Sequence, residues 1–302
     1  MRARVIVNKG GGTVKGSDAD QLAGTLEGLF QRRGVEASII MAVGDELRPS
    51  MEAGRREAER GLLDAVVVGG GDGTISAAAG VLAGSTVPLG VLPLGTLNHF
   101  AKDLGLPLDL DGAVGVIAEG AVRHVDVAEV NGRVFVNNSS IGLYADMVAV
   151  RERLQDDAGH GKWPALVIAG WRTLRRFPLR RLSIRAEGWA RPCKTPFVFV
   201  GNNIYDLSLF NPGGRAALDR GELCLYVLDH RSPWGLLGLG LRAAVGRLDQ
   251  ERDFERTAVK DVEIRSDAHR LRVSLDGEVE TLRPPLRYRT RPGALRVLAA
   301  GT

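Results

Sequence analysis

Two glycine-containing turns in the first third of the sequence have the composition of phosphate-binding loops. The first follows an apolar run at residues 66–68 and reads Gly69-Gly70-Gly71-Asp72-Gly73-Thr74-Ile75-Ser76-Ala77. The second follows another apolar run and reads Pro93-Leu94-Gly95-Thr96-Leu97-Asn98. Glycines let backbone N–H groups approach one object closely, and the start of a following helix adds partial positive charge. Both turns are therefore predicted to bind phosphate.

A carboxylate lies inside the first turn. Asp72 would repel a bare phosphate, but it would suit Mg²⁺, bound directly or through water, that bridges to the phosphates. The sequence has neither the GxGxxG pattern with a later acid nor GxxxxGK[ST], which argues against a dinucleotide fold and a P-loop. Each motif alone could be an ordinary tight turn with no ligand. The presence of two such motifs in neighbouring strand-to-helix turns disfavours that interpretation.

A second pair of acids lies near the end of the chain, in Leu275-Asp276-Gly277-Glu278. Residues two apart on a strand share a face, so Asp276 and Glu278 are expected to point into one cleft. Transfer of a phosphoryl group to an alcohol needs a carboxylate that accepts the hydroxyl proton. A hairpin turn with solvated acids is the alternative.

The elements that position the glycine turns alternate between strand and helix. Strands are expected at 4–8, 35–41, 64–68 and 88–92, and helices at 20–33, 49–60, from 74 onward, 97–104 and 111–119. This order predicts a parallel sheet with helices on both faces. The strand-to-helix turns of such a sheet share one edge, so both glycine turns would face one ligand.

After residue 124 the helical period weakens. Strands are expected at 125–130, 133–138, 182–186, 196–200, 222–228, 262–265, 271–275 and 294–299, with helical material at 147–154, 164–176 and 233–246. The chain therefore divides into an α/β domain at 1–123 and a mostly antiparallel β domain at 124–290.

The composition is that of an ordinary globular protein. The chain has 302 residues, 44% of them hydrophobic, and a formal net charge of +4. This charge is too small to indicate nucleic acid by itself. Cys193 and Cys224 form no disulfide framework or CxxC pattern, which favours a reducing cytoplasmic setting. No signal peptide or apolar stretch of spanning length is seen.

The two glycine turns together, extended by His99-Phe100-Ala101, resemble the diacylglycerol kinase catalytic family in its bacterial soluble lipid kinase branch, which is related to sphingoid-base kinases. The resemblance implies an ATP- and Mg²⁺-dependent lipid kinase. It also implies a nucleotide-binding α/β domain, a β-sandwich, and an active site in the cleft between them. The last residues, 291–302, would return to the first domain.

The resemblance also implies roles for individual residues. ATP would contact Asn8, Gly70, Gly71, Asp72, Gly73, Thr74, Ile75, Ser76, Ala77, Gly95, Thr96 and Asn98. Asp276 and Glu278 would be catalytic, either one being the base, with Asp126 and Lys162 in the active-site network. Lys9 replaces the family's proline after Asn8. Arg220 occupies the place of an aspartate that binds a structural Mg²⁺, so this metal is expected to be absent, and Arg220 to pair with Asp219 or Glu222.

A basic stretch runs from Trp163 to Arg185 and carries two tryptophans and several arginines. Such a segment suits the headgroup layer of an anionic membrane, which predicts peripheral contact at the inner membrane face; a solvated helix face is the alternative. No nucleic-acid motif accompanies it. The lipid, whose hydroxyl would receive the γ-phosphate, is diacylglycerol or a related lipid, and phosphatidylglycerol, a sphingoid base and a prenyl alcohol stay open. A homodimer is also left open. An NAD kinase-like enzyme and a non-catalytic nucleotide sensor are the alternative functions.

Overall fold

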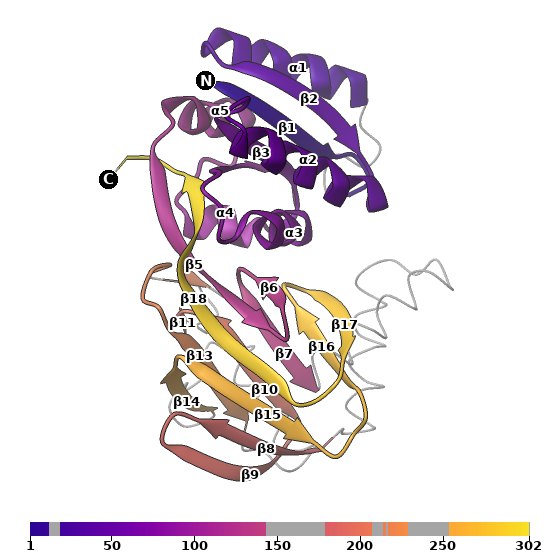
Figure 1. The fold of residues 1–302 in the computed structure, drawn as a ribbon, viewed down its shortest axis with the longest axis vertical. Coiled ribbons are helices and arrows are strands. Elements are labelled where there is room, and N and C mark those ends of the chain that lie inside the picture. Colours follow the sequence, from indigo (N-terminus) through magenta and orange to yellow (C-terminus); the bar gives the residue numbers. More distant parts are fainter. Residues whose placement is uncertain (12–18, 143–178, 207–213, 216, 229–253, 302) are drawn as a thin grey trace, which may run out of the picture.

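The fold is seen in a computed structural model that describes residues 1–11, 19–142, 179–206, 214–215, 217–228 and 254–301. An α/β unit and a β unit lie end to end along the long axis (Figure 1). The helices expected at 147–154, 164–176 and 233–246 and the site residue Lys162 lie outside the described residues.

The first unit is built on a parallel sheet in the order β2-β1-β3-β4. Its strands are β1 (Arg2–Asn8), β2 (Glu36–Ala42), β3 (Ala65–Gly70) and β4 (Leu89–Pro93). The α-helices between and after them are α1 (Ala19–Arg32), α2 (Leu47–Glu59), α3 (Asp72–Leu82), α4 (His99–Asp103) and α5 (Leu110–Glu119), with a 3-10 turn at Gly44–Glu46. The parallel α/β arrangement predicted from the sequence is confirmed.

Apolar side chains explain why this sheet forms. All six residues of β3 are buried, as expected for a central parallel strand covered on both faces. One apolar cluster lies with α3 and includes Ile6, Val68 and Leu82; the other lies with α1 and includes Phe30 and Val67.

The second unit contains antiparallel strands in two layers. One layer is β5 (Val122–Val130), β6 (Arg133–Phe135), β8 (Arg180–Ala186), β9 (Trp189–Thr195), β15 (Asp261–Ser266) and β18 (Leu286–Leu298). The other is β7 (Asn138–Gly142), β10 (Phe197–Asn202), β13 (Leu223–Leu228), β14 (Phe254–Val259), β16 (Leu271–Leu275) and β17 (Glu278–Leu282). A short ribbon joins β11 (Tyr205–Asp206) to β12 (Gly214–Arg215). An apolar cluster from both layers includes Ile141, Val198 and Tyr288.

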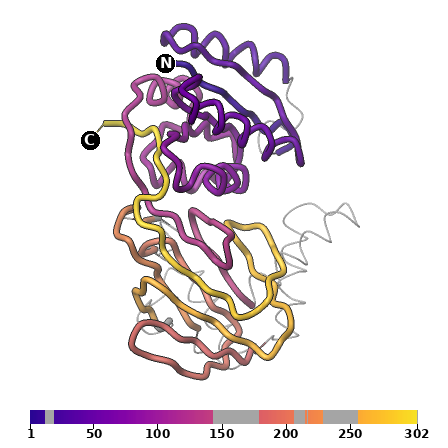
Figure 2. The backbone as a smooth tube through the Cα atoms, viewed as in Figure 1, coloured from indigo at the N-terminus to yellow at the C-terminus, as the bar shows by residue number. Residues whose placement is uncertain are grey.

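Two long strands connect the units. β5 and β18 pair with one another on both sides of an irregularity between Arg291 and Leu295. Beyond it, Val297 pairs with Leu89 of β4, so the chain end lies against the parallel sheet (Figure 2). The first layer of the β unit thus continues the sheet of the α/β unit.

The region expected as one strand at 133–138 is two strands. β6 ends at Phe135 and β7 begins at Asn138. The amides of Val136, Asn137 and Asn138 donate to the Asp276 carboxylate. The backbone turns there because its donors face a carboxylate from another element.

Candidate active site

Three strand ends of the parallel sheet meet at one edge. At the end of β1, Asn8 Nδ2 donates to Thr74 Oγ1 at 3.0 Å, and its Oδ1 accepts from the Gly10 amide at 2.9 Å. Gly70 leaves room for the Thr74 side chain, which a β-carbon at Gly70 would meet at 2.7 Å. Asn8 therefore links the loop after β1 to the first turn of α3.

The two glycine turns touch one another. A β-carbon at Gly95 would lie 2.5 Å from the Gly71 α-carbon, so only glycine fits there. Asn98 holds the second turn: its Oδ1 accepts from the Gly95 amide at 2.9 Å, and its Nδ2 donates to the Pro93 and Gly95 carbonyls. Asn98 itself has φ of 51°, a left-handed conformation that asparagine tolerates.

Asp72 joins the second turn to the first. It begins α3, and its Oδ1 accepts from the Phe100 amide in α4 at 3.2 Å. Ile75 differs from its neighbours in this helix. Its side chain is buried in the core, and its amide donates to the Gly71 carbonyl. Ile75 therefore supports α3 from beneath, whereas Asp72, Gly73, Thr74 and Ser76 are partly exposed and Ala77 is exposed.

The acidic pair of the β unit lies against the start of α3. The Glu278 carboxylate fills the space that a β-carbon at Gly73 would occupy. Gly73, Ser76 and Ala77 line one side of a cavity of about 180 Å³, and Leu275, Glu278 and Glu280 line the other. Arg48 and Arg133 also contribute to the lining. The first glycine turn and the Asp-Gly-Glu hairpin thus face one cleft between the two units.

Asp276 is held by backbone amides of the segment between β6 and β7. Its Oδ2 accepts from the Val136 amide at 2.8 Å, and its Oδ1 accepts from the Asn137 and Asn138 amides at 2.8 and 2.9 Å. Burial raises the pKa of Asp276, while hydrogen bonds from the Ser76 hydroxyl and these amides partly offset the rise. Asp276 also has φ of 48° at the hairpin turn, and Asp276 N donates to the Asn138 carbonyl.

Asp126 fixes the junction between the units. It is 2% exposed, its Oδ2 accepts from Gly221 N at 2.6 Å, and its Oδ1 accepts from Gly293 N at 2.8 Å. Both carboxylate oxygens therefore bind backbone of the 217–221 loop and of the β18 irregularity. Arg220 is exposed, and its amide donates to Asn203 Oδ1. Asp219, a partner expected for Arg220, forms an ion pair with Arg123 at 3.9 Å.

A network centred on Arg215 was not predicted. Arg215 Nε donates to Asp103 Oδ2 at 2.8 Å, and the side chains of both residues are almost completely buried. No spacing in the sequence connects position 103 to position 215, so only the fold reveals the pair.

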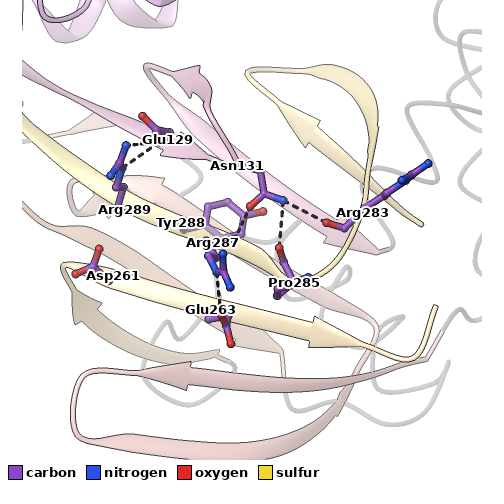
Figure 3. Close-up of a pocket in the computed structure, with 9 residues that line it drawn as sticks. All are labelled: Glu129, Asn131, Asp261, Glu263, Arg283, Pro285, Arg287, Tyr288 and Arg289. Carbon is purple, nitrogen blue, oxygen red and sulfur yellow. Dashed lines mark hydrogen bonds and ion pairs between the residues drawn. The ribbon is translucent and has the colours of Figure 1, made fainter. Parts of the chain in front are cut away.

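A larger pocket of about 740 Å³ lies on the β unit alone. Its lining comes from β5, β15, β18 and the turns beside them, with no residue of α3 or the glycine turns. The charges there neutralise one another, since Arg289 pairs with Glu129 and Arg287 with Glu263 (Figure 3). The glycine turns and the acidic pair, not this pocket, form the candidate active site.

Comparison with known proteins gives one family. The family model of the diacylglycerol kinase catalytic domain matches residues 2–130. A probable lipid kinase, YegS-like, of Pseudomonas savastanoi is 32% identical over 244 residues, which are 77% of this chain and 74% of that protein. The diacylglycerol kinase of Bacillus subtilis is 34% identical over 151 residues, 48% of this chain and 47% of that protein. This chain covers 38% of a longer Synechocystis relative.

Solved structures share the fold. A diacylglycerol kinase structure from Bacillus anthracis superposes with a TM-score of 0.68 at 20% identity, covering 99% of this chain and 97% of that one. Yeast NADH kinase superposes less well, with a TM-score of 0.53 at 12% identity and 84% of its chain covered. Among the described residues, no helix has the length and apolar character needed to cross a membrane.

Proposed function

Because the chain belongs to the diacylglycerol kinase catalytic family, we propose that it transfers the γ-phosphate of ATP to a hydroxyl group of diacylglycerol or a related lipid. The observation that carries the proposal is the contact between Gly73 and Glu278, since it brings a phosphate-binding helix start to a pair of carboxylates. Phosphoryl transfer depends on this positioning and on charge stabilisation.

The phosphates of ATP bind at the edge where the glycine turns meet. The backbone at Gly70–Gly73 and at Gly95–Thr96 approaches them, and the start of α3 supplies partial positive charge. Asn8 and Asn98 act through the loops that they hold, by the hydrogen bonds described above. Thr74, Ser76 and Ala77 lie on the partly exposed side of the same helix turn.

Asp72 and Glu278 are the carboxylates that would hold Mg²⁺. Mg²⁺ is usually bound by one or two carboxylates together with phosphates and water, so this small set of oxygen donors fits it. When bound, the ion would neutralise charge on the phosphates during transfer. Asp72 is partly exposed, and Glu278 lies at the same helix start.

Asp276 is the group that accepts the hydroxyl proton. Burial raises the pKa of its carboxyl, and a general base works best when its pKa lies nearer the operating pH. Ser76 of α3, which lines the cavity, also affects this carboxyl by lowering its pKa. Asp126 acts by fixing backbone at the junction. Lys162 is kept as a candidate for stabilising phosphate charge.

The lipid is bound by the β unit at 124–290, and the nucleotide by residues 1–123 with the returning segment 291–302. Contact with the inner membrane face is proposed for residues 163–185. In the described part of that stretch, Arg181 and Arg185 are exposed on β8. Flotation with anionic liposomes tests this contact. Equal flotation of wild type and an Arg181→Glu/Arg185→Glu variant would show that these two arginines do not bind the membrane.

Incubation with radiolabelled ATP and a total lipid extract tests the function itself. Wild type should label one lipid class in the presence of Mg²⁺, and Asp276→Asn/Glu278→Gln should not. Asp267→Asn is a matched control, since Asp267 is exposed in the turn after β15 and lines neither of the two cavities described above. Labelled lipid from the double variant at the wild-type rate would refute the assignment, and nucleotide binding without transfer by wild type would favour a nucleotide sensor.

A further inference from the structure

A buried arginine connects the nucleotide-binding turns to the acidic pair. Arg215 lies on β12 of the β unit, and its carboxylate partner Asp103 ends α4 of the α/β unit. Arg215 Nε donates to Asp103 Oδ2 at 2.8 Å, and Arg215 N to Asp103 Oδ1 at 3.3 Å. The side chains are 0% and 7% exposed, so this pair, the Arg215–Asp103 bridge, is shielded from water.

The rest of the guanidinium binds the segment between β6 and β7. Nη1 donates to the Val136 carbonyl at 2.6 Å and to the Asn202 carbonyl at 3.1 Å, and Nη2 donates to Asn137 Oδ1 at 3.0 Å. The guanidinium also lies 5.3 Å from the ring centre of Tyr205. A buried charge is stable only when its hydrogen bonds are satisfied, and Arg215 meets that condition with partners from several elements.

The segment 136–138 is therefore bound by a cation at its hydrogen-bond acceptors and by a carboxylate at its hydrogen-bond donors. Arg215 binds acceptors, the Val136 carbonyl and the Asn137 side chain, while Asp276 binds the donors of Val136, Asn137 and Asn138. Chains of hydrogen bonds polarise one another, so a cation at the Val136 carbonyl strengthens the Asn137 amide, which belongs to the same peptide group, as a donor to the carboxylate.

The other end of the bridge reaches the glycine turns. α4 starts directly after Asn98, and the Phe100 amide of α4 donates to Asp72. A continuous path thus runs from Asp72 through α4, Asp103, Arg215 and the 136–138 segment to Asp276.

We propose that Arg215 is a positioning residue for phosphoryl transfer, which sets the Asp276 carboxylate relative to the nucleotide turns through Asp103 and the 136–138 amides. This inference rests on the proposed function, since it takes Asp276 as the group that meets the substrate hydroxyl. Arg215 itself touches neither ATP nor lipid in this scheme.

The test compares Arg215→Lys and Asp103→Asn with Arg4→Met. Lysine keeps the positive charge but cannot reach all four acceptors, and asparagine keeps the shape of aspartate without its charge. Arg4→Met is the matched control, since Arg4 forms a partly buried 2.7 Å ion pair with Glu57 wholly inside the α/β unit. All are assayed well below their measured melting temperatures.

The expected result has two parts. First, kcat falls about 10- to 100-fold in both bridge variants while the KM for ATP changes little, since a misplacement of about 1 Å can cost this much. Second, hydrogen exchange of the 136–138 amides becomes faster, because their hydrogen bonds to Asp276 are weaker. Arg4→Met should show neither of these.

The outcomes distinguish the positioning role of Arg215 from the proposed kinase function. Folded bridge variants with the wild-type kcat and wild-type exchange at 136–138 would overturn the positioning role. If wild type transfers no phosphate, the proposed function fails, yet faster exchange in the bridge variants would still establish the connection to the Asp276 segment. If Arg215→Lys does not fold, Asp103→Asn carries the same test.

Discussion

Gly95→Ala tests whether contact between the two glycine turns is required for nucleotide binding. The new β-carbon would lie 2.5 Å from the Gly71 α-carbon and 2.7 Å from Asn98 Oδ1. Non-bonded carbons approach to about 3.5–4.0 Å, so the turns must separate by about 1 Å. Relief by side-chain rotation is excluded at Gly71, because the obstructing atom there belongs to the backbone.

Two consequences of this separation are measurable. Overpacking costs about 1–3 kcal/mol, which lowers the melting temperature. A shift of about 1 Å in the phosphate-binding backbone should lower kcat/KM for ATP about 100-fold. Steady-state kinetics with varied ATP at saturating lipid would measure the loss, and calorimetry with a non-hydrolysable ATP analogue would show it as weaker binding.

Gly24→Ala is the control for this experiment. Gly24 lies on the exposed side of α1, where a new β-carbon meets nothing within 4 Å. Replacing a helical glycine by alanine should stabilise the protein by about 0.5–1 kcal/mol without a change in kinetics. A Gly95→Ala protein with wild-type kcat/KM for ATP would refute the idea that both turns bind one nucleotide.

Three further outcomes are expected. Burial raises the pKa of Asp276 above its ordinary 3.8, so this carboxyl takes up a proton at higher pH than an ordinary aspartate. As the pH is lowered through that raised pKa, kcat/KM should therefore fall. A pH–rate profile whose acidic limb stays at or below 3.8 would contradict Asp276 as the base. Asp126→Ala removes two charge-assisted hydrogen bonds to backbone and should cost roughly 3 kcal/mol or more in the free energy of unfolding, read by urea denaturation, with unchanged stability as the contrary result. Arg220→Asp should make the melting temperature rise with added Mg²⁺, whereas wild type should respond less; equal responses would show that Arg220 does not decide metal binding at this loop.

The α/β unit was predictable because its sequence signals are local. Apolar runs such as 66–68 follow from burial on both sheet faces, and the glycine turns follow from backbone that must approach other groups closely. The strand expected at 64–68 was found at Ala65–Gly70, and the helix expected from Thr74 begins at Asp72. Both boundaries lie within two residues of the prediction.

The β unit was harder to predict where strands lack an apolar pattern. The edge strands β9 and β14 and the hairpin strand β17 were missed. Pro192 interrupts the pattern of β9, and an edge strand tolerates it because a missing donor there faces solvent. Two of the five residues of β17 are charged, Glu278 and Glu280, and both line the cleft. The first half of β18 carries Arg287 and Arg289 at outward positions, and only its end was predicted.

Candidate site residues can be recognised in the sequence where chemistry and spacing coincide, but not where only tertiary contacts bring residues together. Asp276 and Glu278 stand out as acids beside a glycine at a strand end. Asp103 and Arg215 look like ordinary surface charges in the sequence, yet both side chains are buried. The same limit applies to Ile75, which lies in the middle of a phosphate-binding motif but packs into the core beneath it.

The paired β5 and β18 strands limit how the enzyme can admit and release its substrates. Because both strands extend from one unit into the other, the halves are not joined by a loose tether about which they could swing. Widening the cleft requires bending of a hydrogen-bonded ribbon, and the easiest place is the irregularity between Arg291 and Leu295, where Gly293 donates to Asp126. Relative movement of the two halves would therefore be small, and Asp126, which holds the backbone of this irregularity, would oppose it.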